Sequence, residues 1–436
     1  MRRHLALLVV CFAGLVAPRA HAVEVKEITT PLGIKAWLVE DKSTPLVALS
    51  FAFASGSASE PDDQKGVTSL AAILLTDGAG PLDARAFRQR QEDAAASVGL
   101  SSSPDRVSGS LRVLSANRDE GFELLRLALS EARFDQDMLD QRRAQAIGAL
   151  NQASQRPGTV AQRTLAATVF AGHPYAHDTS GLRESLKTLT VADLKARAAA
   201  VLVRRGLTIT AVGDIDGPEL ARQLDRAFGG LPDGSEPQPL PDWTPTAQPR
   251  SVMIERAVPQ SSILIAMPGI PRSDPDWYPY LVMTHILGSG PQSRLFSEVR
   301  EKRGLAYTIS GGIRVYRKAA LFMISSGSAN EKVPETLRVI RSELARMRNE
   351  GVSAEELADA KTYLSGSLAL SLDSSGAIAG LMQSLQLDGL PRDHIDKRPA
   401  LIAAVKPEDV RRVARRVLRE EAMTTVVVGK AAGAAE

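Results

Sequence analysis

Two stretches of the sequence hold residue types that could bind a ligand directly. Residues 173–177, His-Pro-Tyr-Ala-His, place two imidazoles four positions apart. This spacing can hold a metal ion on a helix, but Pro174 disrupts a helix there. Residues 288–291, Gly-Ser-Gly-Pro, contain the glycines of a phosphate-binding loop without the Gly-Lys-Ser/Thr ending or the preceding strand. Neither stretch therefore predicts a metal or nucleotide site by itself.

The N-terminus has the pattern of an export signal. Arg2 and Arg3 precede an apolar run over residues 5–17. Residues 20–22, Ala-His-Ala, then place small residues where a signal peptidase cleaves. We expect residues 1–22 to be removed and the mature chain to be periplasmic. The apolar run is too short for a stable membrane anchor.

The histidines and the cysteine offer few ligands once this signal is removed. The one cysteine of the chain, Cys11, lies inside it, so the mature protein would have none. This excludes a cysteine nucleophile and thiolate metal ligands, and it suits the bacterial periplasm. His4 and His21 also leave with the signal, while His285 and His394 are isolated in the sequence.

Length and composition predict a globular protein of two or three domains. The chain has 436 residues, of which 44% are hydrophobic and 24% charged, and both fractions are ordinary for globular domains. Without the three arginines of the signal, 50 basic residues remain against 50 acidic residues. A formal charge near zero, with no basic block interleaved with aromatics, argues against a nucleic-acid partner.

An internal repeat divides the chain into two copies of one pattern. In the first copy, a helix that opens at Asp193 leads to a strand over residues 207–212 and then to Gly213. In the second, a helix that opens at Glu408 leads to a strand and then to Gly429 at the same offset. Earlier elements recur in the same order, with predicted runs at 49–54, 66–75 and 138–150 in the first copy and 263–267, 278–287 and 357–372 in the second.

The two copies predict two domains with the same fold. Between them, residues 231–249 are rich in Pro, Gly, Ser and Asp, so we expect an exposed linker over residues 231–250. The N-terminal domain would then span residues 23–230 and the C-terminal domain residues 251–436. Each copy mixes short β-branched runs with longer helical patterns. This favours an α+β domain with a mostly antiparallel sheet and helices packed on one side.

Two stretches within this framework resemble the pitrilysin/insulinase family of zinc peptidases, also called inverzincins. In the first copy the matching stretch is Gly56-Ser57, Glu60-Pro61, residues 66–75 and Gly78. In the second copy the match runs over residues 287–296 and 298–307. The resemblance covers essentially the whole mature chain. It implies two homologous domains arranged as a clam-like half-shell.

The resemblance also implies that this chain has lost its zinc ligands. In active members the helix of the first copy carries H-x-x-E-H, whose histidines bind zinc while the Glu polarises a bound water. That motif falls on Ser69, Ala72 and Ile73, and the family's third ligand falls near Gly148-Ala149. None of these side chains can bind zinc, and Ile73 would put hydrocarbon in the metal's place. We therefore expect no cofactor in this chain.

The second copy keeps the other part of the family's site. Arg300 and Tyr307 preserve the spacing of the Arg and Tyr that complete the active site from the domain opposite the zinc. A phenol can stabilise the negative charge on a carbonyl oxygen during peptide hydrolysis, and a guanidinium can hold substrate carbonyls. The alternative is structural: Arg300 would cap a helix and Tyr307 would begin a strand. Residues 288–291 resemble a shortened form of the glycine loop in the non-catalytic subunit of mitochondrial processing peptidase.

By this resemblance, the chain is similar to the processing-peptidase alpha subunit and to bacterial periplasmic homologues. It would be the non-catalytic subunit of a heterodimeric periplasmic zinc peptidase, binding peptide and contributing Arg300 and Tyr307 in trans. Its partner would be a homologous subunit with H-x-x-E-H, which would hold the zinc. Two alternatives remain open. The chain could be a scaffold, like the related core subunits of the respiratory cytochrome bc complex, or a solitary peptide-binding protein.

Overall fold

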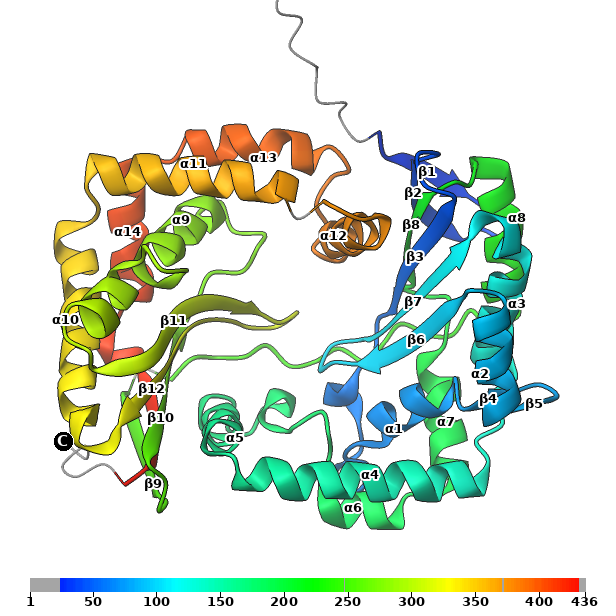
Figure 1. The fold of residues 1–436 in the computed structure, drawn as a ribbon, viewed down its shortest axis with the longest axis horizontal. Coiled ribbons are helices and arrows are strands. Elements are labelled where there is room, and N and C mark those ends of the chain that lie inside the picture. Colours follow the sequence, from blue (N-terminus) through cyan, green and yellow to red (C-terminus); the bar gives the residue numbers. More distant parts are fainter. Residues whose placement is uncertain (1–23, 247, 371, 431–436) are drawn as a thin grey trace, which may run out of the picture.

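The computed structural model describes residues 24–246, 248–370 and 372–430, and in it the chain forms two halves, each built on one sheet (Figure 1). The predicted signal lies outside the described residues. The first sheet has the order β1-β2-β8-β3-β7-β6, and its neighbours are antiparallel except β2 and β8. Its strands are β1 (Lys26–Thr29), β2 (Lys35–Glu40), β3 (Leu46–Phe53), β6 (Ser97–Ser102), β7 (Val107–Leu114) and β8 (Thr208–Gly213).

Eight helices belong to this first half in the described part of the chain. They are α1 (Val67–Leu74), α2 (Ala84–Asp93), α3 (Arg118–Ser130), α4 (Gln136–Gln155), α5 (Pro157–Val169), α6 (Arg183–Thr188), α7 (Val191–Val201) and α8 (Gly217–Phe228). A small ribbon of β4 (Gly78–Ala79) and β5 (Leu82–Asp83) follows α1. Pro157 opens α5 at a position where a missing N–H costs nothing, and Asp216 caps α8 through a hydrogen bond to the Glu219 N–H.

The second half repeats this architecture. Its sheet has the order β11-β12-β10-β13-β9, and the only parallel pair in it is β13 with β9. Its strands are β9 (Arg250–Glu255), β10 (Gln260–Pro268), β11 (Ala306–Val315), β12 (Ala320–Ala329) and β13 (Thr424–Gly429). Its helices are α9 (Trp277–Gly288), α10 (Val333–Glu350), α11 (Ala354–Leu370), α12 (Ser375–Leu387), α13 (His394–Ala403) and α14 (Pro407–Val417).

The strand orders of the two sheets correspond one to one. The series β2-β8-β3-β7-β6 matches β9-β13-β10-β12-β11, with the parallel pair in the same place, and β1 is the one addition. The predicted α+β fold with two homologous halves is therefore confirmed. Most of each half's own helices cover one face of its sheet, as α3 and α8 do in the first half (Figure 1).

The opposite face of each sheet receives one helix from the other half. Helix α5 packs on β10 and β13 of the second sheet, and helix α12 packs on β3 and β8 of the first (Figure 1). On β10, Ile263 and Ile265 therefore join their own half's core, while the intervening Leu264 joins a cluster with Leu165 of α5. Burial on both faces explains why these strands are apolar without alternation.

Two residues of the segment between the halves contact the folded domains, which residues of an exposed linker would not do. It contains no helix or strand between α8 and β9 within the residues that the structure describes. Leu240 is buried, however, and the Trp243 indole N–H donates to the carbonyl oxygen of Val169 at 3.1 Å. The expectation of a fully exposed linker is wrong at these two positions. No helix in the described ranges is long and apolar enough to cross a membrane.

Candidate functional site

Arg300 lies in a π-helical turn, Phe296–Glu301, which follows α9 and leads into β11. Turns of this kind are rare and occur frequently at functional sites. The Arg300 side chain is exposed, and its guanidinium carbon lies 4.8 Å from the centre of the Phe296 ring. This cation–π contact orients the guanidinium over the turn. Its hydrogen-bond donors contact no acceptor among the described residues, so they are available to a ligand.

Tyr307 lies at a β-bulge in the edge strand β11. The register passes from the pair Ala306–Ser328 to the pair Thr308–Gly327, which leaves Tyr307 as the extra residue. Bulges bend a strand and redirect a side chain, and they are common beside active sites. Tyr307 is 62% exposed, and its hydroxyl has no hydrogen-bond partner in the described part of the chain. The bulge therefore presents an unpaired phenol to solvent.

An ion pair between the buried Arg294 and the half-buried Glu356 anchors the start of the segment that carries both residues. Arg294 donates from Nε and Nη2 to the Glu356 carboxylate at 2.6 and 2.8 Å, and from Nη2 to the Gly351 carbonyl at 2.8 Å. Burial acts to raise the pKa of Glu356, but hydrogen bonds from Arg294 and Ser353 outweigh it and lower that pKa to about 2. This bidentate pair fixes the segment against the N-terminus of α11.

Within residues 288–291, Gly288 has a packing role. A side chain at Gly288 would place its Cβ 2.5 Å from the backbone of Gly311 on β11. Ser289 also donates from its hydroxyl to the Gly311 carbonyl oxygen at 3.3 Å. Close approach of α9 to β11 thus explains why glycine stands at the end of this helix.

The three positions of the zinc motif lie on α1, the helix that the sequence predicts for them. The Ser69 hydroxyl donates to the Thr179 carbonyl at 2.6 Å, and Ala72 is 2% exposed. Ile73 is 42% exposed, so at this position the helix presents hydrocarbon to solvent. Gly148 and Ala149 are exposed on α4, which packs against α1. None of these residues offers a metal ligand, so the set does not fit zinc.

Hydrogen bonds from neighbouring residues nevertheless hold the start of α1 in place. The buried Glu60 carboxylate accepts hydrogen bonds from the N–H groups of Gly66 and Thr68, both at 2.8 Å, at the start of the helix. Arg197 donates to the Thr68 hydroxyl at 2.8 Å and to the Gly56 carbonyl at 2.7 Å. These contacts cap and hold the helix without involving its lost ligands. The positioning framework of the zinc helix therefore persists although its metal-binding side chains do not.

His173 supports the local backbone. Its Nδ1 accepts a hydrogen bond from the Tyr175 N–H at 3.2 Å, so its Nε2, 2.9 Å from the Pro241 carbonyl oxygen, carries the proton and donates. Both ring nitrogens are thus engaged, and Pro174 opens a short 3₁₀ turn. No group of three or more His, Cys, Asp or Glu side chains is placed to hold a metal ion in the ranges that the structure describes.

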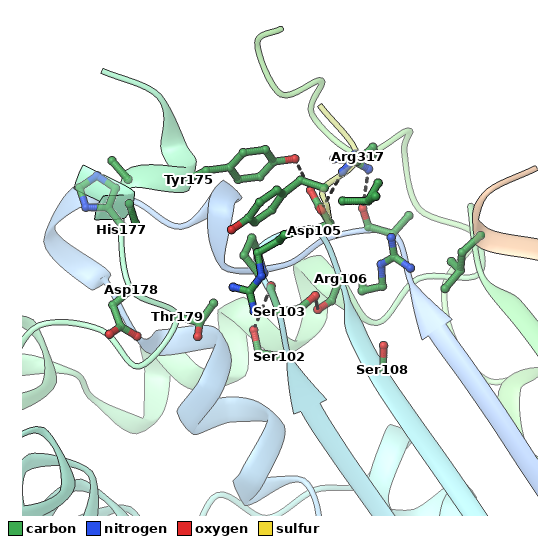
Figure 2. Close-up of a pocket in the computed structure, with 18 of the residues that line it drawn as sticks. Ser102, Ser103, Asp105, Arg106, Ser108, Tyr175, His177, Asp178, Thr179 and Arg317 are labelled. Carbon is green, nitrogen blue, oxygen red and sulfur yellow. Dashed lines mark hydrogen bonds between the residues drawn. The ribbon is translucent and has the colours of Figure 1, made fainter. Parts of the chain in front are cut away.

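A cavity of about 1270 Å³ lies between the two halves, lined by segments of both. Figure 2 shows Tyr175, Asp105 and Arg317 close together on its wall, with His177 and Asp178 farther along. The Tyr175 hydroxyl donates to Asp105, whose other carboxylate oxygen accepts from the Arg317 N–H at 2.9 Å. Burial, followed by the hydrogen bond to Asp105, raises the pKa of Tyr175. This network joins the hairpin β6–β7 of one half to the equivalent hairpin β11–β12 of the other.

The structure does not bring Arg300 and Tyr307 to the degenerate zinc positions. Helix α1 lies in one half and strand β11 begins in the other (Figure 1). The two parts of the site expected from the sequence therefore occupy separate halves of this chain. Neither Arg300 nor Tyr307 lines the cavity between the halves.

The fold and these two sites are those of a peptidase-like chain without its metal ligands, and comparison with known proteins identifies the family. Residues 35–181 match the family described as insulinase (peptidase family M16), and residues 188–364 match the peptidase M16 inactive domain. Together the two matches take in well over half of the chain. The chain belongs to the M16 family of peptidases.

Similar proteins in this family carry different descriptions. An uncharacterized zinc protease of Streptomyces coelicolor is 28% identical, with 72% of this chain and 70% of that protein covered. A non-peptidase homolog, YmxG, of Helicobacter pylori is 26% identical, with 83% of both chains covered. The crystal structure of a peptidase M16 inactive domain from Pseudomonas fluorescens gives a TM-score of 0.89 at 28% identity and covers 94% of this chain and 98% of that one. A protease from Helicobacter pylori has the same fold, with a TM-score of 0.86 at 18% identity, over 93% and 99% of the two chains.

The residues that line the cavity between the halves are the ones that sequence reasoning missed. Its walls come from residues far apart in the chain, such as Asp105 and Arg317, which no local pattern connects. The repeat nevertheless contains a feature that could have indicated these residues. Because the two copies share a strand order, the turns after β6 and β11 are equivalent, and both contain arginines, Arg106 and Arg317.

Proposed function

We propose that the chain is the non-catalytic subunit of a heterodimeric periplasmic zinc peptidase. It binds peptide and supplies Arg300 and Tyr307 to the zinc site of a homologous partner that carries H-x-x-E-H. The observation that supports this most directly is that the structure exposes both Arg300 and Tyr307. A π-turn and a β-bulge, two irregularities that are frequent at functional sites, hold a guanidinium and a phenol at the surface without hydrogen-bond partners among the described residues.

The roles of the two residues follow from their chemistry. Zinc bound by the partner would activate the attacking water. The Tyr307 hydroxyl would donate to the oxygen of the scissile carbonyl as negative charge develops there, which lowers the barrier more than it tightens substrate binding. Arg300 would donate from its planar guanidinium to carbonyl oxygens of the peptide and hold it in register. An edge strand such as β11, which begins at Ala306, also offers unpaired backbone groups to an extended peptide.

Copurification tests this proposal directly. The chain, carrying a C-terminal affinity tag, is isolated from the periplasm of its own host, and every stoichiometric partner is identified together with its zinc content. We expect a second two-domain chain with H-x-x-E-H, one zinc ion per pair, and peptide cleavage that a chelator abolishes. Elution of the chain without such a partner, or a pair whose cleavage survives chelation, would contradict the proposal.

A second candidate function is peptide binding without proteolysis. Two observations favour it: this chain alone forms the cavity between its halves, and a relative of 26% identity is described as a non-peptidase homolog. The same copurification separates the two functions. A chain that binds peptides but elutes alone, without associated cleavage, would support the second one.

A further inference from the structure

The cavity between the halves is bounded by two equivalent hairpins. The turn between β6 and β7 contributes Asp105 and Arg106, and the β11–β12 hairpin contributes Arg314 and Arg317. Helices α5 and α12, the segment before α6 and the loop after β10 line the remaining sides. The fold therefore brings arginines from both copies of the repeat to one concave surface, distinct from Arg300 and Tyr307.

The ion pairs in this cavity leave a surplus of positive charge. Five arginines and three aspartates line it: Arg106, Arg163, Arg272, Arg314, Arg317, Asp105, Asp178 and Asp388. Asp178 pairs with Arg163 at 2.6 Å, and Asp388 pairs with Arg272 at 3.0 Å. The carboxylate of Asp105 is already engaged by the Tyr175 hydroxyl and the Arg317 backbone N–H.

Three guanidinium groups remain without a carboxylate within ion-pair distance in the described part of the chain. The guanidinium carbon of Arg314 lies 6.0 Å from the centre of the Tyr316 ring. The Nη1 atom of Arg317 donates a hydrogen bond to the Ala54 carbonyl oxygen at 3.0 Å. The half-buried Arg106 side chain makes no hydrogen bond among the described residues. Like charges gathered in a concave surface repel one another and focus a positive potential there, which an anionic ligand would relieve.

The cavity also supplies hydroxyl groups and room for a chain. Hydroxyl groups line it alongside the arginines: Ser102, Ser103, Ser108, Thr159, Thr179 and Thr208. Its volume of about 1270 Å³ exceeds the roughly 300–1,000 Å³ of ordinary small-molecule pockets. A flexible chain with several carboxylates would occupy more of this volume than a small anion, and it would offer one carboxylate to each arginine.

We propose that this cavity binds an acidic peptide segment, whose carboxylates pair with Arg106, Arg314 and Arg317. The inference rests on the proposed peptide-binding role and adds the class of peptide. Guanidinium–carboxylate contacts are charge-assisted and bidentate, so they discriminate acidic side chains from their amides. Neutral and basic peptides would find the same hydroxyl groups but no counterion for the three guanidinium groups.

Binding of labelled peptides to the purified full chain tests this inference. Three fluorescent decapeptides of one design carry Glu, Gln or Lys at the same four positions, and their affinities are measured by fluorescence anisotropy at two salt concentrations. We expect the Glu peptide to bind at least about tenfold more tightly than the Gln peptide, with an affinity that falls as salt rises. Equal affinity for the three peptides, or displacement of the Glu peptide by millimolar glutarate, would overturn the inference.

A matched pair of triple variants assigns the effect to the cavity. The test variant is Arg106→Gln/Arg314→Gln/Arg317→Gln. The control removes the same charge from exposed positions on α2 and α14, as Arg85→Gln/Arg88→Gln/Arg415→Gln. We expect the test variant to lose the preference for Glu over Gln while the control keeps it, with both chains folded by circular dichroism. Loss of the preference in both variants would indicate general charge attraction and sink the proposal.

The outcome is separable from that of the proposed function. The anisotropy assay needs no partner and no zinc, so it reports only on the cavity. If the Glu peptide binds without preference while a zinc-bearing partner copurifies, the cavity inference fails alone. If the preference is present but no partner is found, the heterodimeric function fails alone.

Discussion

Replacing Tyr307 by Phe removes only the hydroxyl group of this side chain and thereby tests the proposed role of the chain. The hydroxyl makes no hydrogen bond among the described residues, and the ring is 62% exposed. Its removal therefore leaves no buried group unpaired and opens no space in the core. We expect the free energy of unfolding of the isolated chain to change by less than about 0.5 kcal/mol. Any functional loss is then a loss of chemistry and not of folding.

The expected effect on turnover is large by comparison. Loss of one donor to a developing oxyanion reduces kcat by about 10²–10³, or about 2.7–4 kcal/mol. Tyr307 is exposed in the chain alone, and a partner would have to cover it before the hydrogen bond reached that strength. We therefore expect about the lower value, a hundredfold fall in kcat, with KM changed by less than about threefold because the donor acts mainly in the transition state.

The assay is steady-state peptide cleavage by the copurified complex, with wild-type chain or variant. Tyr363→Phe is the control because this tyrosine is 58% exposed on α11, where its ring stacks on His285 at 4.6 Å. It removes the same atom from a comparable surface position. An unchanged kcat for Tyr307→Phe, or an equal fall for Tyr363→Phe, would refute the assignment of Tyr307 as an oxyanion donor.

Three further changes have expected outcomes. Arg300→Ala in the complex should raise KM by roughly tenfold or more with a smaller effect on kcat, because the lost contacts are charge-assisted hydrogen bonds to substrate; a fall in kcat alone would contradict this role. The pKa of Glu356 is lowered from 4.5 to about 2 on folding, so its stabilising contribution is complete above about pH 4.5 and is lost as pH falls through about 2. Partial exposure reduces that contribution to about 1–2 kcal/mol, and thermal melts of Glu356→Gln between pH 6 and 2 should show a smaller acid-induced fall in Tm than wild type. Met382→Ala removes a fully buried side chain of α12 and should cost about 2–5 kcal/mol in chemical denaturation, whereas Leu370→Ala, at an 81% exposed position, should cost less than about 0.5 kcal/mol.

Local patterns in the sequence are sufficient to predict several helices and strands and the repeat that relates the two halves. The strand predicted over residues 207–212 is β8 (Thr208–Gly213), and the helix predicted over residues 278–287 is α9 (Trp277–Gly288). These elements are continuous apolar runs bounded by glycine or by charged residues, so neighbouring residues alone determine them. The positions Ser69, Ala72 and Ile73 likewise fall on one helix, as the pattern over residues 66–75 predicts.

The exchange of helices could not be predicted in the same way. The sequence of α5 does not indicate which of the two sheets this helix will cover. The unbroken apolar run over residues 263–267 is typical of a strand that is buried on both faces, but it does not show what covers the second face. The bulge at Tyr307 was also hidden, because it arises from the pairing of β11 with β12 and not from a local glycine or proline.

The exchange of α5 and α12 makes each half incomplete without the other. A fragment that ended at residue 230 would carry α5 with no surface to cover, and would expose Trp37, Val39 and Val212, which α12 now shields. The complementary fragment would expose Leu264 and Val426 in the same way. The chain thus behaves as a covalently joined pair of interlocked lobes. A nick in the connecting segment would leave the lobes associated, whereas expression of either one alone would yield an insoluble product.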